Sequence, residues 1–271
     1  MDSPQNYNDE VVCDTPPENQ TYVPETPPEN LPTNTRWYRP VEESKNWSCN
    51  VMEFYHNGDA SSCISFFVGN MKLMRFRWKE ITKNRRPEQL FPWTIMPPQF
   101  YDLLCETPNH GALPFCIGMK EEYPALWDVD TVYIPIVVED THWLLLRVDM
   151  RTLEMYVYFT ENCEDGVCQT TCIHRLFYPI ITRFETLFKS FLDNILFWEN
   201  CGRDVIPKLK ILGTEVWPQY NGPVGSNSGV FVCMLMRNLV LELPNQIEGN
   251  LQDTCMKYRR FMADEFYAAR A

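Results

Sequence analysis

The chain has 271 residues and a mass of 32.0 kDa, with 45% hydrophobic and 14% aromatic residues, which suits one well-filled domain and excludes a wholly disordered chain. Its net charge of −12 argues against a general nucleic-acid binder, and no window has the roughly 18 unbroken apolar residues of a membrane span. The first residues, MDSPQNYNDE, lack the basic and apolar regions of a signal peptide, so we expect an intracellular chain, nuclear or cytoplasmic, whose 11 cysteines stay reduced.

Residues 1–35 differ in composition from the rest of the chain. They contain seven acidic residues, no Lys or Arg and seven of the 21 prolines, and the pentapeptide TPPEN occurs twice. A segment with few apolar residues, many prolines and charges of one sign cannot offset the entropy that folding costs. We therefore predict a disordered acidic tail at 1–35 and a folded domain at 36–271.

The first half of the body contains a basic segment and then three strand-like runs. Lys72–Arg86 holds seven basic residues and one acidic residue, which favours a solvated strand and turn, with a nuclear address or an acidic partner as the alternative. Thr131–Val138, His142–Asp149 and Leu153–Phe159 are rich in β-branched and aromatic residues and are separated by short polar links. They predict adjacent antiparallel strands. Pro135 lacks an N–H group, so we expect a bulge or an edge there.

Helical periodicity dominates the second half of the body. Apolar residues recur at spacings of three and four over His174–Asn200, which predicts a long helix with a wide apolar face. A second helix should begin near Ser228 and end before Pro244, and a last helix should cover about Gln252–Arg270. Strands followed by helices, without strict alternation, indicate an α+β fold.

Three short motifs occur in a fixed order in this body: YIPI at 133–136, HW at 142–143 and NSGVFVC at 227–233. In this order and spacing the chain resembles the ubiquitin-like-protein-specific proteases, the deSUMOylating cysteine peptidases, over about residues 120–270. The resemblance implies a papain-like cysteine-protease fold, with a central mixed or antiparallel sheet flanked by helices. It also implies cleavage of peptide or isopeptide bonds after the di-glycine tail of a SUMO-like modifier.

The resemblance also assigns catalytic positions, several of which have changed. His142 stands at the catalytic histidine, but Ser228 replaces the nucleophilic cysteine, Asn227 replaces the preceding aspartate, and Phe159 replaces the aspartate that orients the imidazole. Gln219 is the candidate oxyanion donor. A hydroxyl is far more basic than a thiol, so Ser228 would need an oriented histidine as general base. A phenyl ring cannot accept the imidazole N–H, and we therefore predict little or no activity.

Alternatives remain open at two of these positions. Glu161 shares the strand parity of Phe159 and is a candidate replacement acceptor for the imidazole, whereas Asp149 lies at the far end of its strand and should cap the next turn. Tyr220 competes with Gln219 for the oxyanion position.

Several cysteines and one tryptophan carry weaker signals. Trp143 stands where the family walls the narrow channel for the di-glycine tail, although core packing explains a tryptophan there almost as well. Cys233 fits a small buried hydrophobe better than a surviving nucleophile. A final group could ligate zinc, but its spacing favours a Cys-rich surface loop: Cys163, Cys168, Cys172 and His174.

The partners and cofactors follow from these assignments. We expect no metal and no cofactor. The expected partner is a ubiquitin-like, SUMO-like modifier or its conjugates. We expect binding neither to nucleic acid nor to a membrane. The sequence does not define the oligomeric state. The alternative to a peptidase is a non-catalytic binding module for such a modifier or for another protein.

Overall fold

The computed structural model describes residues 71–86, 90, 92–106, 110–120, 122–138, 142–159, 169–203, 207–216, 227–245, 247 and 249–270. The predicted tail at 1–35, and residues 36–70 of the predicted domain, lie outside this part. The elements in chain order are α3 (Met71–Thr82), β1 (Trp93–Ile95), α4 (Phe100–Cys105), α5 (Leu113–Cys116), the 3-10 turn η2 (Leu126–Asp128), β2 (Thr131–Val138), β3 (His142–Asp149), β4 (Glu154–Phe159), α6 (Gln169–Asn194), α7 (Phe197–Asn200), β5 (Lys210–Val216), α8 (Ser228–Leu241) and α9 (Leu251–Arg270). None of the described helices has the length and apolar character needed to cross a bilayer.

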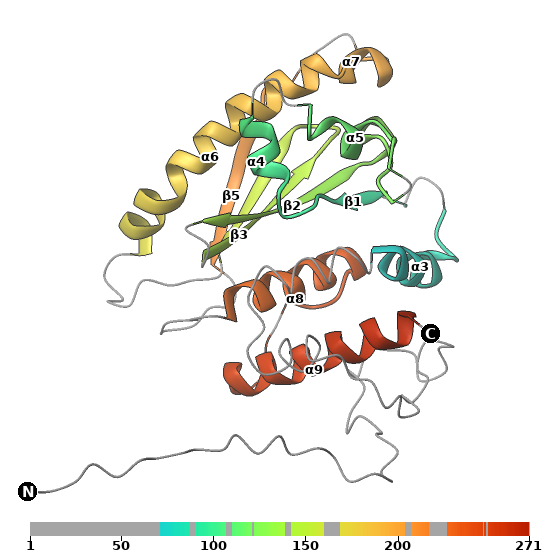
Figure 1. The fold of residues 1–271 in the computed structure, drawn as a ribbon, viewed down its shortest axis with the longest axis vertical. Coiled ribbons are helices and arrows are strands. Elements are labelled where there is room, and N and C mark those ends of the chain that lie inside the picture. The colour runs from blue at the N-terminus through green and yellow to red at the C-terminus, as the bar shows by residue number, and fades with distance from the viewer. Residues whose placement is uncertain are drawn as a thin grey trace, which may run out of the picture.

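The described strands form one mixed sheet in the order β1-β2-β3-β4-β5, and Figure 1 shows its layered setting. Strands β2, β3 and β4 are antiparallel neighbours, whereas β1 and β5 run parallel to β2 and β4. A sheet with helices packed on it, without regular βαβ alternation, confirms the predicted α+β class and the papain-like arrangement of a central mixed sheet flanked by helices.

The three predicted strands are confirmed, with one residue of difference at the start of β4. Leu153 lies in the preceding turn with a φ of 54°, a left-handed conformation that costs a branched residue about 1–2 kcal/mol. Its side chain is fully buried, which offsets that strain. The expected bulge at Pro135 is wrong, because Pro135 pairs in regular register with Leu145. The expected edge holds locally, since β1 pairs only with the first three residues of β2, ending at Tyr133.

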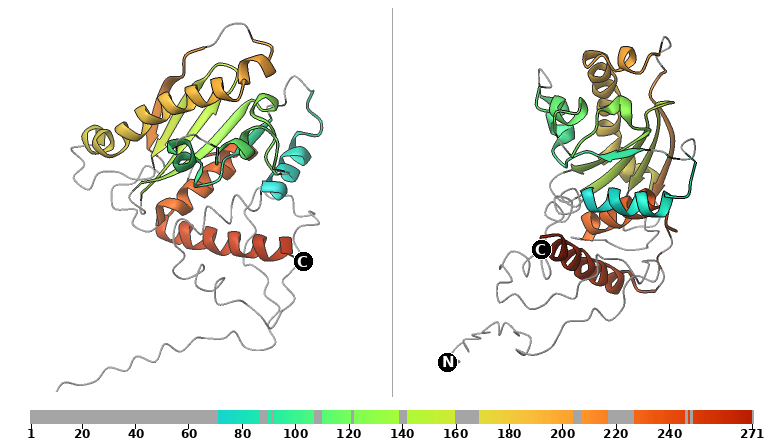
Figure 2. Two further views of the ribbon diagram at one scale, coloured as in Figure 1. Left: turned by 45° about the horizontal axis from the view of Figure 1, so that its top comes forward. Right: turned by 90° about the vertical axis from the view of Figure 1, so that its right-hand side faces the viewer.

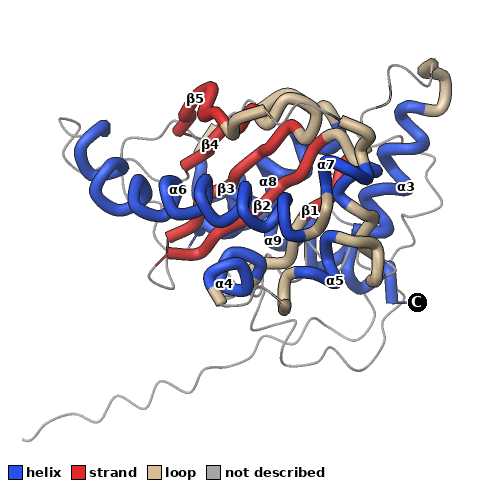
Figure 3. Tube along the Cα trace, turned by 90° about the horizontal axis from the view of Figure 1, so that it is seen from above, coloured by secondary structure: helices blue, strands red, loops and turns tan. Residues whose placement is uncertain are grey.

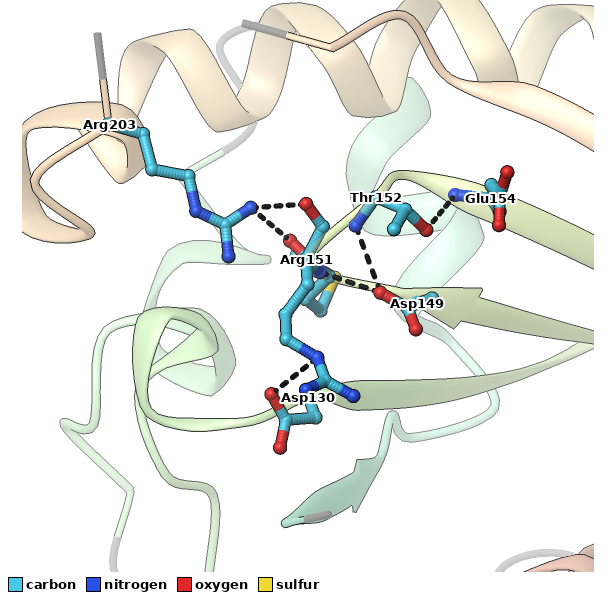
Figure 4. Close-up of polar contacts among 7 residues, drawn as sticks. Asp130, Asp149, Arg151, Thr152, Glu154 and Arg203 are labelled. Carbon is cyan, nitrogen blue, oxygen red and sulfur yellow. Dashed lines mark hydrogen bonds and ion pairs between the residues drawn. The ribbon is translucent and has the colours of Figure 1, made fainter. Parts of the chain in front are cut away.

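Asp149 caps the turn from β3 to β4, as predicted. Figure 4 shows its carboxylate accepting hydrogen bonds from the backbone N–H groups of Arg151 and Thr152, at 2.8 and 2.9 Å. The Arg203 side chain donates to the carbonyl oxygens of Met150 and Arg151 in the same turn. This turn is at the opposite end of β3 from His142, so Asp149 serves the fold there and is remote from residue 142.

Helices cover both faces of the sheet, and each face has its own core (Figures 1 and 2). Helix α6 crosses one face, as the view in Figure 3 shows, and α4 and α7 pack on the same side. Helix α8 packs on the other face beside α3, and α9 covers the outer side of α8. We call these two cores the α6-side core, which includes Leu144, Leu146, Phe159, Phe177 and Phe184, and the α8-side core, which includes Trp143, Leu145, Tyr158, Val230 and Phe231.

One predicted helix has different bounds, and one segment predicted as a strand and turn is a helix. The long helix begins earlier than predicted, at Gln169, and it ends at Asn194, because Leu196 adopts a left-handed φ of 54° and separates α6 from α7. The basic segment Lys72–Arg86 is mainly the helix α3 and contains no strand. Met71 and Met74 are buried at a spacing of three, so an apolar face, rather than the charge count, decides its structure.

The buried tyrosines predict a loss of stability in alkali. Burial raises the pKa of Tyr133 to about 12, and burial likewise raises the pKa of Tyr101 and of Tyr123 to about 12. In the unfolded chain these phenols ionise near pH 10. The folded chain therefore binds more protons than the unfolded chain between about pH 10 and 12, and its free energy of unfolding falls as the pH rises through that window.

Urea unfolding at pH 8, 10 and 11 measures this effect, and tyrosinate absorbance near 295 nm measures ionisation directly. Tyr133→Phe is the matched variant, since it keeps the ring and removes one titrating group. Its stability should fall less steeply with pH than that of the parent chain. Equal slopes for the two chains would contradict the assignment.

Candidate functional site

Strand β3 and helix α8 bring two of the predicted site segments into contact. Helix α8 packs directly against β3. Trp143, the second residue of β3, is 0% exposed and belongs to the same buried cluster as Val230 and Phe231 of α8. This complete burial agrees with the core-packing interpretation of Trp143. The proposed role in a di-glycine channel stays a prediction.

Ser228 is the first residue of α8, and it is fully buried. All residues of α8 except Asn238 and Leu239 are buried, because the helix lies between the sheet and α9. The start of such a helix carries the positive end of its dipole, equivalent to roughly half a unit charge. Position 228 would therefore favour a thiolate, but a hydroxyl does not ionise near neutral pH.

The strand register relates position 142 to position 159. His142 begins β3 opposite Val138, and Leu144 lies opposite Phe159. Position 142 comes two residues before Leu144, so it is a cross-strand diagonal neighbour of position 159. Diagonal neighbours lie about 7–8 Å apart, within reach of long side chains. The imidazole of His142 itself lies outside the described part of the structure.

Phe159, which the sequence predicts at the position of an orienting aspartate, is a core side chain. It is 2% exposed and packs in the α6-side core, where its ring centroid is 5.1 Å from that of Phe177 on α6. Phe177 is also buried, at 3% exposed. An aromatic pair of this kind stabilises the fold but offers no acceptor for an N–H group. In this chain, therefore, position 159 joins strand β4 to helix α6.

Residues from α9 contact the start of α8, a contact that the sequence did not predict. The amide of Asn227, next to Ser228, hydrogen-bonds to the side chains of Gln252 at 3.0 Å and of Arg259 at 3.1 Å. Arg259 is 3% exposed. The sequence does contain one indication of this role. Arg259 lies four residues after Cys255 and three before Met262, so a charged residue interrupts the apolar stripe of α9.

The other candidate residues divide between core and undescribed segments. Cys233 is 0% exposed within the α8-side core, as expected of a small buried hydrophobe. Gln219, Tyr220 and Glu161 lie outside the described residues, as do Cys163 and Cys168 and the side chains of Cys172 and His174. Within the described ranges, no group of three or more His, Cys, Asp or Glu side chains could hold a metal ion.

A comparison with protein families gives one match. Residues 94–161 match the model of the Ulp1 protease family, C-terminal catalytic domain. The chain carries a Ulp1-family segment. This segment runs from β1 to just beyond β4 and so includes positions 142 and 159, which confirms the predicted resemblance over this range. It ends before Ser228, whose assignment therefore rests on the order of the motifs and on the packing of α8 against β3.

Solved structures of this class resemble the chain at low identity. A SUMO protease Ulp1 with its catalytic cysteine oxidised to a sulfenic acid is 16% identical, covers 78% of this chain and 77% of its own, and has a TM-score of 0.46. The C-terminal Ulp1 protease domain in complex with Smt3, the yeast ortholog of SUMO, is 16% identical over 76% and 75%, with a TM-score of 0.49. XopD of Xanthomonas campestris bound to ubiquitin is 16% identical over 75% and 89%, with a TM-score of 0.38. No curated protein sequence matches the chain.

The packing of Phe159 predicts the cost of repairing the site. Phe159→Ala should lower the free energy of unfolding by about 3–5 kcal/mol, because it leaves a cavity beside Phe177. Phe159→Asp should cost at least as much, since it also buries a carboxylate. Phe159→Leu, which keeps most of the volume, should cost less than about 1.5 kcal/mol.

Chemical denaturation of the three variants measures these costs. Tyr156→Ala on the same strand is the matched control, because Tyr156 is 39% exposed and its truncation should cost clearly less than Phe159→Ala. If Phe159→Ala and Tyr156→Ala lowered stability equally and by little, position 159 would not be the core contact described above.

Proposed function

We propose that the chain is a degenerate Ulp1-type domain, which binds a ubiquitin-like modifier of the SUMO type by its di-glycine tail and has lost efficient turnover. The observation that carries the proposal is Phe159, a fully apolar, packed side chain at the position from which the family's aspartate orients the imidazole. In serine proteases, removing only the aspartate that orients the histidine lowers the rate by a factor on the order of 10⁴.

The nucleophile position adds a second obstacle to turnover. Ser228 needs a general base in the transition state, because its hydroxyl cannot form the stable anion that a cysteine thiol forms at a helix start. Without an acceptor for its second N–H, the histidine at position 142 would not be held in the correct tautomer. The loss of the orienting acid and the loss of the thiol both slow one step, the attack on the carbonyl carbon. Together they lower its rate further than either loss alone.

The scaffold for tail binding is better preserved than the chemistry. Trp143 keeps its place at the start of β3, and α8 still packs against that strand. A slot formed between such elements selects glycine because a Cβ atom does not fit, and this selection needs no thiol. The packing of α8 against the start of β3 supports retained recognition of a di-glycine tail, whereas Trp143 itself is fully buried in the α8-side core.

Binding of a mature modifier to the full chain tests the proposal. In calorimetric titrations, yeast Smt3 ending in Gly-Gly should bind with saturation, and Smt3 truncated before Gly-Gly should bind at least tenfold more weakly. Smt3 with Ala-Ala in place of Gly-Gly is the matched control for the slot, and it should resemble the truncated form. Ubiquitin, measured in the same way, tests which modifier the domain prefers.

Two outcomes would contradict this function. Equal affinity for all three Smt3 forms would mean that the domain does not recognise the tail. No binding of Smt3 or ubiquitin at 100-fold the concentration of the chain would remove the modifier-binding proposal.

A further inference from the structure

A buried arginine links α9 to the start of α8. The apolar stripe of α9 includes Cys255, Tyr258 and Met262, which are 0%, 9% and 5% exposed, and Arg259 lies within it at 3% exposed. A guanidinium in such a stripe has lost most of its water, which is costly unless hydrogen bonds replace that water. The partners of Arg259 therefore matter to the packing of the two helices.

Arg259 fixes the orientation of two side-chain amides. Its Nη2 donates to Oδ1 of Asn227 at 3.1 Å, and Nδ2 of Asn227 donates to Oε1 of Gln252 at 3.0 Å. A guanidinium can only donate, so Asn227 must present its oxygen to Arg259 and its NH₂ group to Gln252. Gln252 must then present its own oxygen. The three side chains have one consistent arrangement, which we call the Arg259 clamp.

The Arg259 clamp keeps Asn227 from capping its own helix. Asn227 is the N-cap residue of α8, and asparagine is among the preferred residues there. Its side chain nevertheless makes no capping hydrogen bond to α8. The contact with α9 thus determines how Asn227 is held, and Asn227 is covalently joined to Ser228.

We propose that Arg259 is a positioning residue for residue 228, acting through Asn227; this rests on the function proposed above, in which position 228 is the former nucleophile position. In this interpretation, the side chain of Asn227 is there to hydrogen-bond with Arg259 and Gln252. The presence of Asn in place of the family's aspartate is then not by itself evidence that the site has lost its function.

The clamp also brings a buried positive charge close to the start of α8. This charge adds to the positive end of the helix dipole. Cys255 reports the same influence, because burial raises the pKa of its thiol and the charge and hydrogen bond of Arg259 oppose that rise. A thiol introduced at position 228 should experience Arg259 in the same direction.

Thiol titration tests the proposal with a readout that a purely structural role would not change. The full chain carries Ser228→Cys together with His142→Ala, so that no imidazole at position 142 contributes. The thiolate is followed near 240 nm as the difference from the matched chain that retains Ser228. Arg259→Met should raise the pKa of the introduced thiol by about one unit, a tenfold lower thiolate fraction at a fixed pH below it.

Two further variants separate charge from position. Lys257→Met removes an exposed charge from the same helix and should leave the thiol pKa unchanged. Arg259→Lys keeps the charge but cannot reproduce the planar geometry, so its shift should be smaller than that of Arg259→Met. With Asn227→Ala already present, Arg259→Lys should produce no further shift, because the connecting amide is gone.

The results are decisive in either direction. The proposal is overturned if Arg259→Met shifts the thiol pKa no more than Lys257→Met does. It is also overturned if the pKa shift of the Asn227→Ala, Arg259→Lys double variant equals the sum of the two single shifts. Where Arg259→Met does not fold, the Asn227→Ala and Arg259→Lys combination decides alone. No modifier is present in these titrations. If neither Smt3 nor ubiquitin bound, the proposed function would be removed, but the thiol pKa would still test whether Arg259 positions residue 228.

Discussion

The burial of β3 on both faces is the constraint on which the rest of the structure depends. Trp143 and Leu145 enter the α8-side core, while Leu144 and Leu146 enter the α6-side core, and all four are 0% exposed. A slip of one residue in this strand would exchange its two faces and misplace both helices. The register of β3 is therefore strongly specified, and it determines where positions 142 and 159 lie relative to each other.

This constraint explains how the scaffold would survive the proposed loss of turnover. The packing of α6 and α8 on β3 does not require a nucleophile or an orienting acid. At position 159 an aromatic ring stabilises the α6-side core through Phe177, whereas a buried carboxylate there would need partners of its own. Once turnover is not required, the apolar side chain is the more stable choice at that position. The same packing makes the repair of the site costly.

The sequence predicted the elements that depend on local patterns and failed where packing decides. The β-branched and aromatic runs located β2 and β3 to the residue, because such residues are enriched in strands. The break at Leu196 was missed, since nothing in the apolar periodicity marks a left-handed residue. The helix α3 was missed because its many basic residues indicated a solvated strand and turn, whereas the buried Met71 and Met74 give it the apolar face of a helix.

The site shows the same division between pattern and packing. Motif order predicted the roles of positions 142, 159 and 228, and the family match covers the segment that holds the first two. It could not reveal that Phe159 packs on Phe177, which lies across the undescribed residues 160–168 in the chain. Nor could motif order reveal the partners of Asn227, because Arg259 on α9 reaches it from 32 positions away in sequence.

The most direct test of the account is the rate at which the chain releases a fluorophore from the C-terminal di-glycine amide of Smt3. The wild-type rate should equal that of Ser228→Ala, both at the level of the uncatalysed reaction. Ser228→Cys combined with Phe159→Asp should release the fluorophore measurably faster, at a temperature where circular dichroism shows that it is folded. Wild-type release that Ser228→Ala abolishes would contradict the loss of turnover, and a folded but inactive double variant would contradict the assignment of the site.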